Sequence, residues 1–386
     1  MMESRPQIDR CPGVHRPFRA SDGAIIRIRQ PGGRLPVAVL RHLLSIAQRW
    51  GDGMVQVTSR ANIQLRALPL DDCGAVPGPI ADALDATGLV PATHELVRNM
   101  ICSPLTGPER PSLLPLVDEL DTELLDVPLL AELPGRFMWA FDNGSGDVAG
   151  EPWDLCYQSL DAEHGLVATA AGQVWEVPAI EAPSVLLALA QDFQLYRTQA
   201  DHPVWHVDEL ASPIGEGFGP QADRGIVVRR PPQVGPHGTD LLAGAPLGKL
   251  TADMIGALSA LHEVRVTPWR AVLVPGAAER ADELAAAGWI VDPADPWANI
   301  SACTGLPGCR KSSIDTVALA RDMVAAAAAD PTLVTHPVHI SGCARRCGEP
   351  HGDHIDLLAP RDLAQARSIL AAHQGAPDPA SATTRR

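Results

Sequence analysis

The sequence predicts an α+β protein that contains the same strand–helix–strand module twice. Three observations lead to this prediction: a strand and an amphipathic helix near the N-terminus, a second copy of that order later in the chain, and mixed segments after each copy. The 386 residues suffice for about two or three domains of ordinary size. Apolar residues make up 46% and charged residues 20% of the chain, which is typical of globular proteins and excludes wholesale disorder.

The first module begins with a strand at residues 23–30, where apolar and polar side chains alternate. Residues 37–50 carry apolar side chains at helical spacing, which predicts an amphipathic helix. Two further strands are expected at residues 54–58 and 63–68, on either side of the sequence SRAN. The order is therefore strand, helix, strand, strand.

The second module repeats short phrases of the first. GAPLGKL at residues 244–250 resembles RQPGGRL at 29–35, and VRVTPWRAVLV at 264–274 resembles VQVTSRANIQL at 55–65. A helix is expected between the two phrases, at residues 251–261. The shared order and the shared V-x-V-T indicate a duplicated module.

The two copies differ at one notable position. Arg60 in the first copy falls opposite Trp269 in the second. One copy can therefore keep a function that the other has lost.

Charge and hydropathy exclude several classes of protein. The chain has 46 acidic and 31 basic residues and a net charge of −15, which argues against a general nucleic-acid-binding protein. No apolar run approaches the roughly 18–20 residues of a membrane-spanning helix, and the N-terminus has no signal-peptide core. We therefore expect a cytoplasmic protein that binds neither nucleic acid nor membrane. Residues 1–10 and 375–386 are expected to be disordered tails.

Four of the eight cysteines form two close pairs: Cys303 with Cys309, and Cys343 with Cys347. Short Cys-x(n)-Cys loops can each give two thiolates to an iron–sulfur cluster, and neighbouring glycines let the backbone wrap around it. Structural zinc sites favour spacings of roughly two to four residues, so the longer spacing of the first pair fits zinc less well. The pattern favours a [4Fe–4S] cluster, with zinc or buried inert cysteines as the alternatives.

The cysteine pattern resembles the cluster signature of the sirohaem-dependent sulfite and nitrite reductases. TSRANIQL at residues 58–65 is similar to the T-x-R-x-x-x-Q stretch of that family, and VRNM at 97–100 to its R-N-V stretch. The resemblance implies a nitrite/sulfite reductase-like fold that is pseudo-two-fold, with duplicated ferredoxin-like half-domains and two mixed α/β lobes. The implied parts are half-domains at 11–75 and 204–285, a reductase-like lobe at 76–200 and a cluster-binding lobe at 290–374.

The chain departs from those reductases at the residues that hold their substrate. Arg60 and Arg98 match the two arginines that clasp a small oxyanion, but the family's lysine pair falls on Arg136 and Met138. A methionine side chain can neither hold an oxyanion nor pass a proton. The chain is also considerably shorter. These departures argue against reduction of sulfite or nitrite, which stays the alternative function and would require bound sirohaem, a haem-type cofactor.

Residues 11–35 and the sequence LPGRFMWAFDNGSGD at 133–147 resemble the precorrin-3B synthase family of aerobic cobalamin biosynthesis. This resemblance implies a monooxygenase that hydroxylates precorrin-3A at C20 with O2 and closes a γ-lactone, with electrons from NADH. It also implies a non-haem iron beside the [4Fe–4S] cluster. A non-catalytic iron–sulfur electron carrier or redox sensor is a second alternative. We expect residues 133–147 to form a strand that enters a Gly-rich hairpin turn.

A corrinoid precursor carries acetate and propionate groups, whose carboxylates need cationic partners that an acidic chain must supply locally. The fork of an arginine suits a carboxylate, and almost all basic residues here are arginine. Arg60 and Arg98 are the first candidates, and Gln64 is expected to point toward the ring. The further candidates are Arg29, Arg34 and Arg136, together with Arg16, Arg19 and Arg27, and a solvated strand face is the alternative for each.

Two groups of histidines and carboxylates are candidate ligands for the non-haem iron, with ordinary structural histidines as the alternative. They are His202, His206 and Asp208, and His351, Asp353 and His354. No G-x-G-x-x-G fingerprint follows a strand, so NADH is not expected to bind a Rossmann domain of this chain. A separate reductase is the alternative electron donor.

Overall fold

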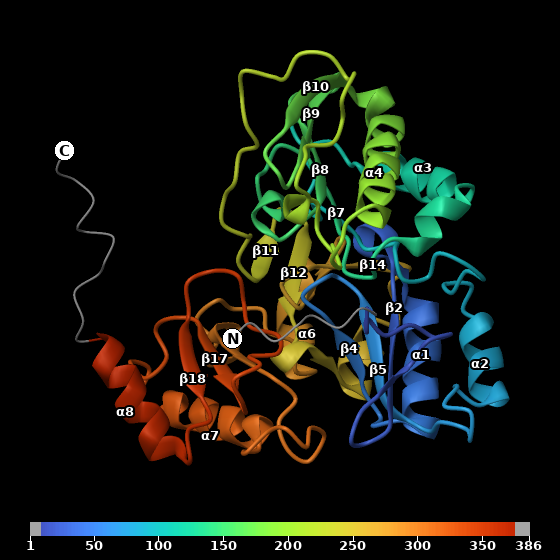
Figure 1. Ribbon diagram of the computed structural model, residues 1–386. Helices are drawn as coiled ribbons and strands as arrows, with labels where there is room; N and C mark the ends of the chain where they lie inside the picture. Colours follow the sequence, from blue (N-terminus) through green and yellow to red (C-terminus); the bar gives the residue numbers. More distant parts are fainter. Residues whose placement is uncertain (1–8, 375–386) are drawn as a thin grey trace. The chain divides into compact units, whose positions relative to one another are not determined.

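The computed structural model describes residues 9–374, which form two compact units. The larger unit ends at Val291 and holds both copies of the duplicated module. The smaller unit begins at Asp292, holds the paired cysteines and also takes in Ala20–Asp22. Both units contain strands and helices (Figure 1), so each is described by itself.

The first copy of the module builds a five-stranded antiparallel sheet. Its strands, in spatial order, are β1 (Phe18–Arg19), β2 (Ala24–Ile28), β5 (Ile63–Leu68), β4 (Val55–Val57) and β13 (Lys249–Leu250). Helix α1 (Val37–Trp50) occupies the predicted range from end to end. Its buried side chains, among them Leu40 and Leu43, share one core with Ile26 and Ile63 of the sheet.

The second copy builds a matching antiparallel sheet. Its strands, in spatial order, are β11 (Gly235–His237), β12 (Asp240–Gly244), β15 (Ala271–Val274), β14 (Glu263–Val266) and β3 (Arg34–Pro36). The two sheets exchange edge strands, because β3 of the first copy pairs with β14 and β13 of the second copy pairs with β4. The two copies therefore form one body that neither could complete alone.

A third sheet carries the chain that lies between the two copies. Its strands, in spatial order, are β10 (Val174–Pro178), β9 (His164–Thr169), β8 (Leu155–Ser159), β7 (Trp139–Asp142) and β6 (Met100–Cys102). Helices α3 (Leu114–Leu125) and α4 (Ala182–Thr198) share a core with this sheet, centred on Phe137, Trp139 and Phe193. The sheet is mixed, since β6, β7 and β8 run parallel and β8, β9 and β10 antiparallel.

The prediction of a hairpin within residues 133–147 is wrong, because β7 runs parallel to the next strand, β8. The buried carboxylate of Asp142 explains the difference. It accepts hydrogen bonds from the main-chain N–H groups of Gly144 and Gly146, both at 2.9 Å, and of Ala149 at 3.2 Å. The Gly-rich stretch therefore coils around one carboxylate, and the chain returns to start β8 in the same direction as β7.

Shorter helices complete the larger unit. They are α2 (Gly78–Asp85), α5 (Ala252–Ala257) and α6 (Ala281–Ala286), with 3₁₀ turns at Pro31–Gly33, Pro128–Glu132, Val148–Gly150, Ala179–Glu181, Val207–Glu209, Pro246–Gly248 and Ala278–Arg280. Helix α5 is shorter than the predicted 251–261. It begins at a Thr251 cap, whose hydroxyl accepts from the N–H of Met254, and it includes Gly256, a poor helix former, near its end.

The smaller unit is a three-stranded parallel sheet with helices. After a 3₁₀ turn at Pro296–Asn299, its strands lie in the order β16 (Ile300–Ala302), β17 (Val338–Ser341) and β18 (Ile355–Leu358). Helix α7 (Thr316–Ala329) connects β16 to β17, and helix α8 (Leu363–Gln374) follows β18. Asp315 caps α7 by accepting hydrogen bonds from the N–H groups of Val317 and Ala318.

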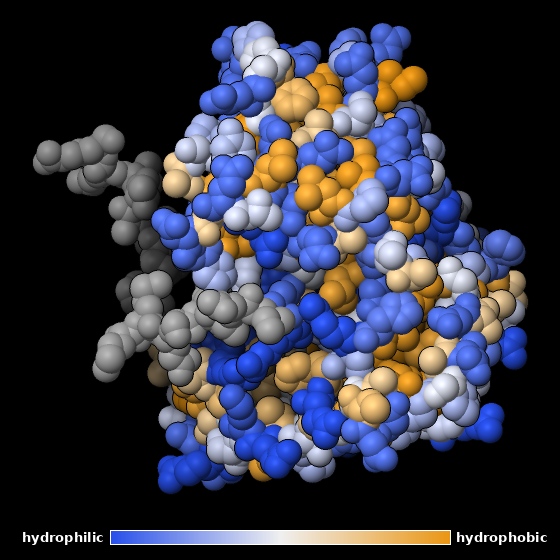
Figure 2. Space-filling view, turned by 45° about the vertical axis from the view of Figure 1, so that its right-hand side comes forward, coloured by the Kyte–Doolittle hydropathy of each residue, from blue (hydrophilic) through white to orange (hydrophobic). Residues whose placement is uncertain are grey.

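The predicted α+β class and the duplicated module are confirmed by these sheets. Among residues 9–374, no helix is long and apolar enough to cross a membrane. Polar residues cover most of the face shown in Figure 2, with apolar residues in smaller patches between them. The tails expected at 1–10 and 375–386 lie outside the described residues, apart from Asp9 and Arg10.

Candidate functional site

Strand β2 and the residue that follows it place two arginines on one side of the first sheet. Arg27 and Arg29 are two positions apart, so their side chains leave the strand on the same face. Arg29 is only 2% exposed; its Nη1 donates to the carbonyl oxygens of Pro12, at 2.6 Å, and Arg27, at 3.1 Å. Its Nε donates to Asn99 at 3.3 Å. Its Nη2 is buried and has no hydrogen-bond partner within the described structure.

Arg27, like Arg29, makes a hydrogen bond with one nitrogen and has another nitrogen buried without a partner in residues 9–374. Its Nη2 donates to Oε1 of Gln64 at 2.9 Å, and Gln64 in turn donates to Gln56 at 2.8 Å. Its Nε is buried and, like Nη2 of Arg29, lacks a partner among the described residues. Gln64, predicted to point toward a ring ligand, thus lies beside Arg27 and orients its guanidinium.

These guanidinium groups are crowded by positive charge. Burial and, second, the charge of Arg60 lower the pKa of Arg27 to about 10. Burial and, second, the charge of Arg27 lower the pKa of Arg29 to about 9. A buried cation whose pKa falls in this way lacks sufficient negative charge nearby. The cluster of Arg27, Arg29 and Arg60 is called the arginine cluster below.

A narrow pocket, too small in this structure to hold a water molecule, lies beside the arginine cluster. Its lining includes Arg27, Arg29, Arg98 and Glu95. Both oxygens of Glu95 are engaged by main-chain N–H groups, of Val14 at 2.9 Å and His15 at 3.1 Å. The one carboxylate in the lining is therefore already bound to the backbone, and a carboxylate from outside would have to widen this space to reach the arginines.

Arg60 lies on the tight connection between β4 and β5. Oγ1 of Thr58 accepts from the N–H groups of Arg60, at 3.3 Å, and Asn62, at 3.2 Å, and Ala61 adopts a left-handed conformation with φ 52. Asn62 donates to the buried Asn99 at 2.9 Å. The turn is therefore held rigidly, while the Arg60 side chain makes no ion pair with the described residues.

Asn99 joins the parts of this region and was missed in the sequence, although it lies inside the VRNM phrase. Its Oδ1 accepts from Arg29 and Asn62, and its Nδ2 donates to the carbonyl oxygens of Gly135 and Phe137 at 3.0 and 3.1 Å. Asn99 thus links the first sheet to the start of β7.

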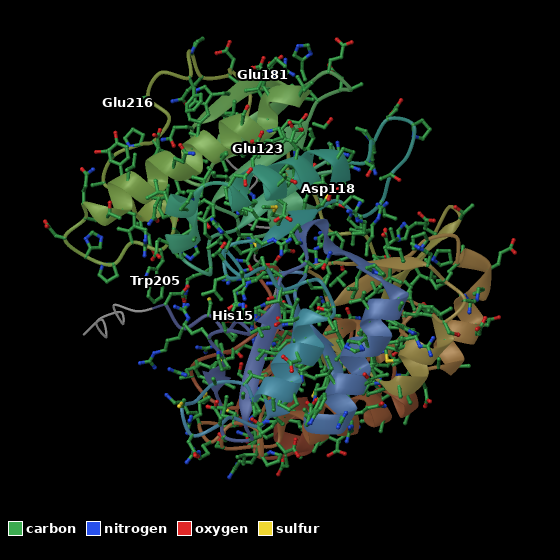
Figure 3. All side chains as sticks on the ribbon, turned by 90° about the vertical axis from the view of Figure 1, so that its right-hand side faces the viewer. His15, Asp118, Glu123, Glu181, Trp205 and Glu216 are labelled. Carbon is green, nitrogen blue, oxygen red and sulfur yellow. The ribbon has the colours of Figure 1, made fainter. Side chains whose placement is uncertain are left out.

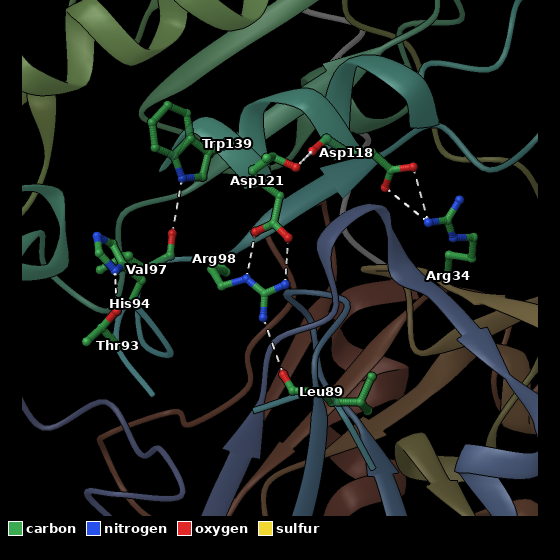
Figure 4. Close-up of polar contacts among 10 residues, drawn as sticks. Arg34, Leu89, Thr93, His94, Val97, Arg98, Asp118, Asp121 and Trp139 are labelled. Atoms are coloured by element: carbon green, nitrogen blue, oxygen red, sulfur yellow. Dashed lines mark hydrogen bonds and ion pairs between the residues drawn. The ribbon is translucent and has the colours of Figure 1, made fainter. Parts of the chain in front are cut away.

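Arg98 and Arg34, both predicted to bind the substrate, are engaged by acids of helix α3 (Figure 4). Arg98 makes a two-pronged ion pair with Asp121, with both N···O distances at 2.6 Å, and also donates to the carbonyl of Leu89. Arg34 donates to both oxygens of Asp118 at 3.1 and 3.2 Å. Each of these two guanidinium groups therefore has a partner within the protein. Their role in binding the substrate stays a prediction.

Arg136 and Met138 lie at the start of β7, where the sequence places the counterpart of a lysine pair. The guanidinium of Arg136 stacks 4.1 Å above the ring centroid of Trp205, and its Nε lies 3.8 Å from Asp9. Met138 is only 3% exposed and belongs to the hydrophobic core. Trp205 is labelled in Figure 3, on the segment that follows α4.

His206 is held by Asp154, a residue that no sequence pattern indicated. Nδ1 of His206 lies 3.2 Å from Oδ1 of Asp154, which is 1% exposed, while His202 and Asp208 are exposed. The hydrogen bond with Asp154 raises the pKa of His206, against the opposing effect of burial. Within residues 9–374, no three His, Cys, Asp or Glu side chains converge on a single metal ion, including the groups around His202 and His351.

The paired cysteines lie in the smaller unit, at the carboxyl ends of neighbouring parallel strands. Cys303 follows β16 and Cys343 follows β17 closely. The N–H of Gly342 donates to Sγ of Cys303 at 3.2 Å, and a Cβ at Gly342 would overlap Ser312. Only glycine can thus bring this amide to the sulfur, an arrangement found where backbone N–H groups stabilise cluster sulfurs.

The four thiols are near one another. Burial raises the pKa of Cys347, and Cys303 and Cys343 raise it further, with Cys309 adding to the effect. In a four-iron cluster each cysteine binds a different iron, so the sulfurs need not converge on one ion. The donor set and the amide at Cys303 therefore fit a [4Fe–4S] cluster, while the assignment of Cys303, Cys309, Cys343 and Cys347 as its ligands stays a prediction.

Comparisons with known proteins find similar proteins of related kinds. Residues 18–76 match the nitrite/sulfite reductase ferredoxin-like half domain. A precorrin-3B synthase of Sinorhizobium sp. is 27% identical over 384 residues, covering 90% of this chain and 80% of that protein. The chloroplastic ferredoxin–nitrite reductase of Zea mays is 26% identical, with 84% of this chain and 67% of that protein covered.

Two mycobacterial proteins extend the comparison. Sulfite reductase [ferredoxin] 2 of Mycolicibacterium paratuberculosis is 25% identical; the match covers 78% of this chain but only 62% of that longer protein. The structure of the Mycobacterium tuberculosis NirA protein superposes with a TM-score of 0.60 at 19% identity, over 84% of this chain and 69% of that one. The last likeness establishes the fold.

Proposed function

Because the chain has the nitrite/sulfite reductase-like fold and resembles precorrin-3B synthase, we propose that it is an iron–sulfur oxygenase of aerobic cobalamin biosynthesis. In this proposal it converts precorrin-3A to precorrin-3B by hydroxylation at C20 and closure of a γ-lactone. O2 is the oxidant, and NADH or a separate reductase supplies the electrons. The proposed place of action is the cytoplasm.

The observation that carries the proposal is the arginine cluster. Two of its guanidinium groups hold buried nitrogen atoms without a partner in the described structure, at Nε of Arg27 and Nη2 of Arg29. Leaving such charged donors unsatisfied costs free energy that a bound carboxylate would recover. A tetrapyrrole fringed with acetate and propionate groups supplies several carboxylates, and bidentate arginine pairing would fix the orientation of the macrocycle.

The other predicted residues take supporting roles in this proposal. Arg60 adds a third cation from a rigid turn, and Gln64 orients Arg27. Arg136, stacked on Trp205, presents a flat cationic surface. The guanidinium groups of Arg98 and Arg34 stay paired with Asp121 and Asp118, and only Arg98 of the two lines the pocket.

Cys303, Cys309, Cys343 and Cys347 would hold the [4Fe–4S] cluster, which supplies one-electron transfer when bound. The resemblance also implies a non-haem iron. Since no ligand group for a single ion converges in residues 9–374, the proposal derives no step from it.

A sirohaem-dependent reductase is the competing function, favoured by the similarity to sulfite and nitrite reductases. The burial of Met138 in the core counts against it, because that position then offers no group to a small oxyanion. A non-catalytic electron carrier or redox sensor would leave the unpartnered arginine nitrogens without a purpose.

Anaerobic purification tests these functions together. Iron and sulfide with a broad absorption shoulder, no sharp haem-type band, and O2-dependent conversion of precorrin-3A would support the oxygenase. A sharp sirohaem band with reduction of sulfite or nitrite would replace it with the reductase. Replacement of Cys309 or Cys343 by Ser should remove the shoulder, and an unchanged spectrum would contradict the ligand assignment.

A further inference from the structure

His206 and Asp154 form a hydrogen-bonded pair in the larger unit that the proposed function leaves without a role. Nδ1 of His206 lies 3.2 and 3.3 Å from the two oxygens of Asp154. Asp154 is 1% exposed, whereas the imidazole is 32% exposed. The pair thus has a buried carboxylate end and an imidazole end that reaches solvent.

The position of Asp154 is fixed by the backbone. Its Oδ2 accepts from the N–H of Met138 at 2.9 Å, and its Oδ1 accepts from the N–H of Val207, also at 2.9 Å. The carboxylate held in this way accepts the Nδ1–H of His206. With Nδ1 engaged, Nε2 is the ring atom that remains for a ligand or a proton, and it has no hydrogen bond to the described residues.

Several charged groups influence the protonation of the imidazole. Asp154 and Glu209 favour its protonated form, and Arg60 opposes it by charge repulsion. Glu209 is itself held, since its Oε2 accepts from the N–H of Trp205 at 2.8 Å. His206 lies on the segment whose Trp205 stacks against Arg136.

We propose that His206 is the proton donor of the site, oriented by Asp154 and next in the chain to Trp205, which stacks on Arg136. The inference rests on the proposed function. In a monooxygenation, one atom of O2 enters the product, and the other leaves as water after it gains two electrons from the reductant and two protons. Nε2–H of His206 gives one of those protons to the departing oxygen and leaves a neutral imidazole, which solvent protonates again. Met138, buried on the same backbone segment, has no proton to give.

Chemical modification tests the placement without turnover. Diethyl pyrocarbonate reacts with neutral imidazole, and peptide mass spectrometry reads each histidine of the full-length, cluster-loaded chain separately. Uroporphyrin III, a stable tetrapyrrole carboxylate, should slow modification of His206 at least about fivefold. It should leave His164 unchanged, because that histidine forms a solvent-exposed pair with Asp161. Equal rates at His206 with and without a tetrapyrrole that demonstrably binds would overturn the placement.

The same reagent tests the orientation by Asp154. The pH dependence of modification should show that Asp154→Asn lowers the pKa of His206, because the carboxylate no longer stabilises the imidazolium. An unchanged pKa in that variant would contradict the pair.

Turnover tests the proton transfer itself. With precorrin-3A and O2, wild-type kcat should fall as pH rises through the pKa of His206, since the donor must be protonated. His206→Gln should lower kcat by about 10²–10⁴-fold with little change in KM, and remove that pH limb. His164→Gln should match wild type. A His206→Gln enzyme with wild-type kcat and pH profile would overturn this inference alone, whereas a wild-type chain that never converts precorrin-3A would overturn the proposed function and this inference together.

Discussion

The two copies of the duplicated module share a backbone but differ in chemistry. The N–H of Thr58 donates to the carbonyl of Asn62 at 3.0 Å, and the N–H of Thr267 donates to that of Ala271 at the same distance. Each turn also holds one left-handed residue, Ala61 with φ 52 and Arg270 with φ 55. The turn is therefore a property of the fold, and the side chains that it carries are free to differ.

The side chain at the tip of each turn decides what the copy can do. Arg60 joins the arginine cluster, whereas Trp269 donates its indole N–H to Oε1 of Glu151 at 2.9 Å. Burial raises the pKa of Glu151 to about 7, although Trp269 and Arg270 lower it. The first copy thus accumulates buried positive charge, and the second is closed by an internal indole–carboxyl pair. A duplicated fold can lose a binding site through one substitution at a turn.

The largest expected effect concerns what the copies share, the exchange of edge strands. A Cβ at Gly33 or Gly248 would overlap the carbonyl oxygen of Val266 or Val57, and both glycines have φ 71. Gly33→Ala and Gly248→Ala should each lower the free energy of unfolding by at least about 3 kcal/mol, because backbone must move in addition to the conformational strain. Chemical denaturation followed by tryptophan fluorescence measures this.

Gly53→Ala is the matched control for that experiment. Gly53 has φ 80, but its added Cβ would meet no atom within 4 Å, so only the conformational penalty of about 1 kcal/mol is expected. If Gly33→Ala cost no more than this control, the close approach of Gly33 to the backbone of Val266 would be wrong.

The second prediction concerns the pH dependence of stability that arises from Glu151, the partner of Trp269 in the second copy. Glu151 is protonated in the folded chain up to pH about 7 but ionises near 4.5 when unfolded. The folded state therefore binds more protons between these values, and stability should fall as pH rises from 4.5 to 7, by up to about 3 kcal/mol. Glu151→Gln keeps the oxygen that accepts from Trp269 and should flatten this part of the pH profile. An unchanged slope in urea titrations across that window would show that Glu151 is ionised in the folded chain.

The third prediction concerns ligand binding by the two turns. Arg60→Ala should weaken binding of a tetrapyrrole carboxylate about 10–100-fold, as expected for loss of a charge-assisted hydrogen bond. Trp269→Phe, at the equivalent position, should leave the affinity unchanged. Fluorescence titration with uroporphyrin III gives both values, and absorption of the cluster should be the same in both variants. Equal loss in the two variants would mean that the pocket is not confined to the first copy.

The sequence predicts the duplicated framework better than the site. Residues 37–50 carry a regular apolar spacing, so helix α1 was predicted from end to end. The turn at Gly144 was misjudged because a single buried carboxylate, Asp142, binds its backbone. Such local carboxylate–backbone binding changes the direction of the chain without leaving a periodic pattern.

Pairs that are distant in the chain were also invisible in the sequence. Arg98 meets Asp121 on α3, and His206 meets Asp154 although 52 residues separate them. Arginine and histidine side chains could be chosen as candidates by type, but their partners depend on packing between separate elements. Sequence patterns therefore identified which residues carry charge, while the structure shows which charges are already neutralised.

The smallest effect concerns the ion pair of Arg34 with Asp118, which joins the first copy to α3, in comparison with the more buried pair of Arg98 with Asp121. Arg34 and Asp118 are 40% and 50% exposed, whereas Arg98 and Asp121 are 13% and 18% exposed. Asp118→Asn should change the free energy of unfolding by less than about 1 kcal/mol, and salt should screen even that. Asp121→Asn should cost about 3 kcal/mol, because it leaves a largely buried guanidinium without its partner.

The comparison of these two variants in denaturant at low and high salt decides what holds β3 in the second sheet. If Asp118→Asn were as damaging as Asp121→Asn, the exchanged strand would depend on the Arg34 ion pair rather than on its pairing with β14. The expected small effect would instead assign the exchange to main-chain hydrogen bonds and apolar burial at Leu35, which is fully buried. Arg34 would then have no structural duty, whereas Arg98 would be held by its ion pair with Asp121. Arg27, Arg29 and Arg60 would remain available to bind a ligand.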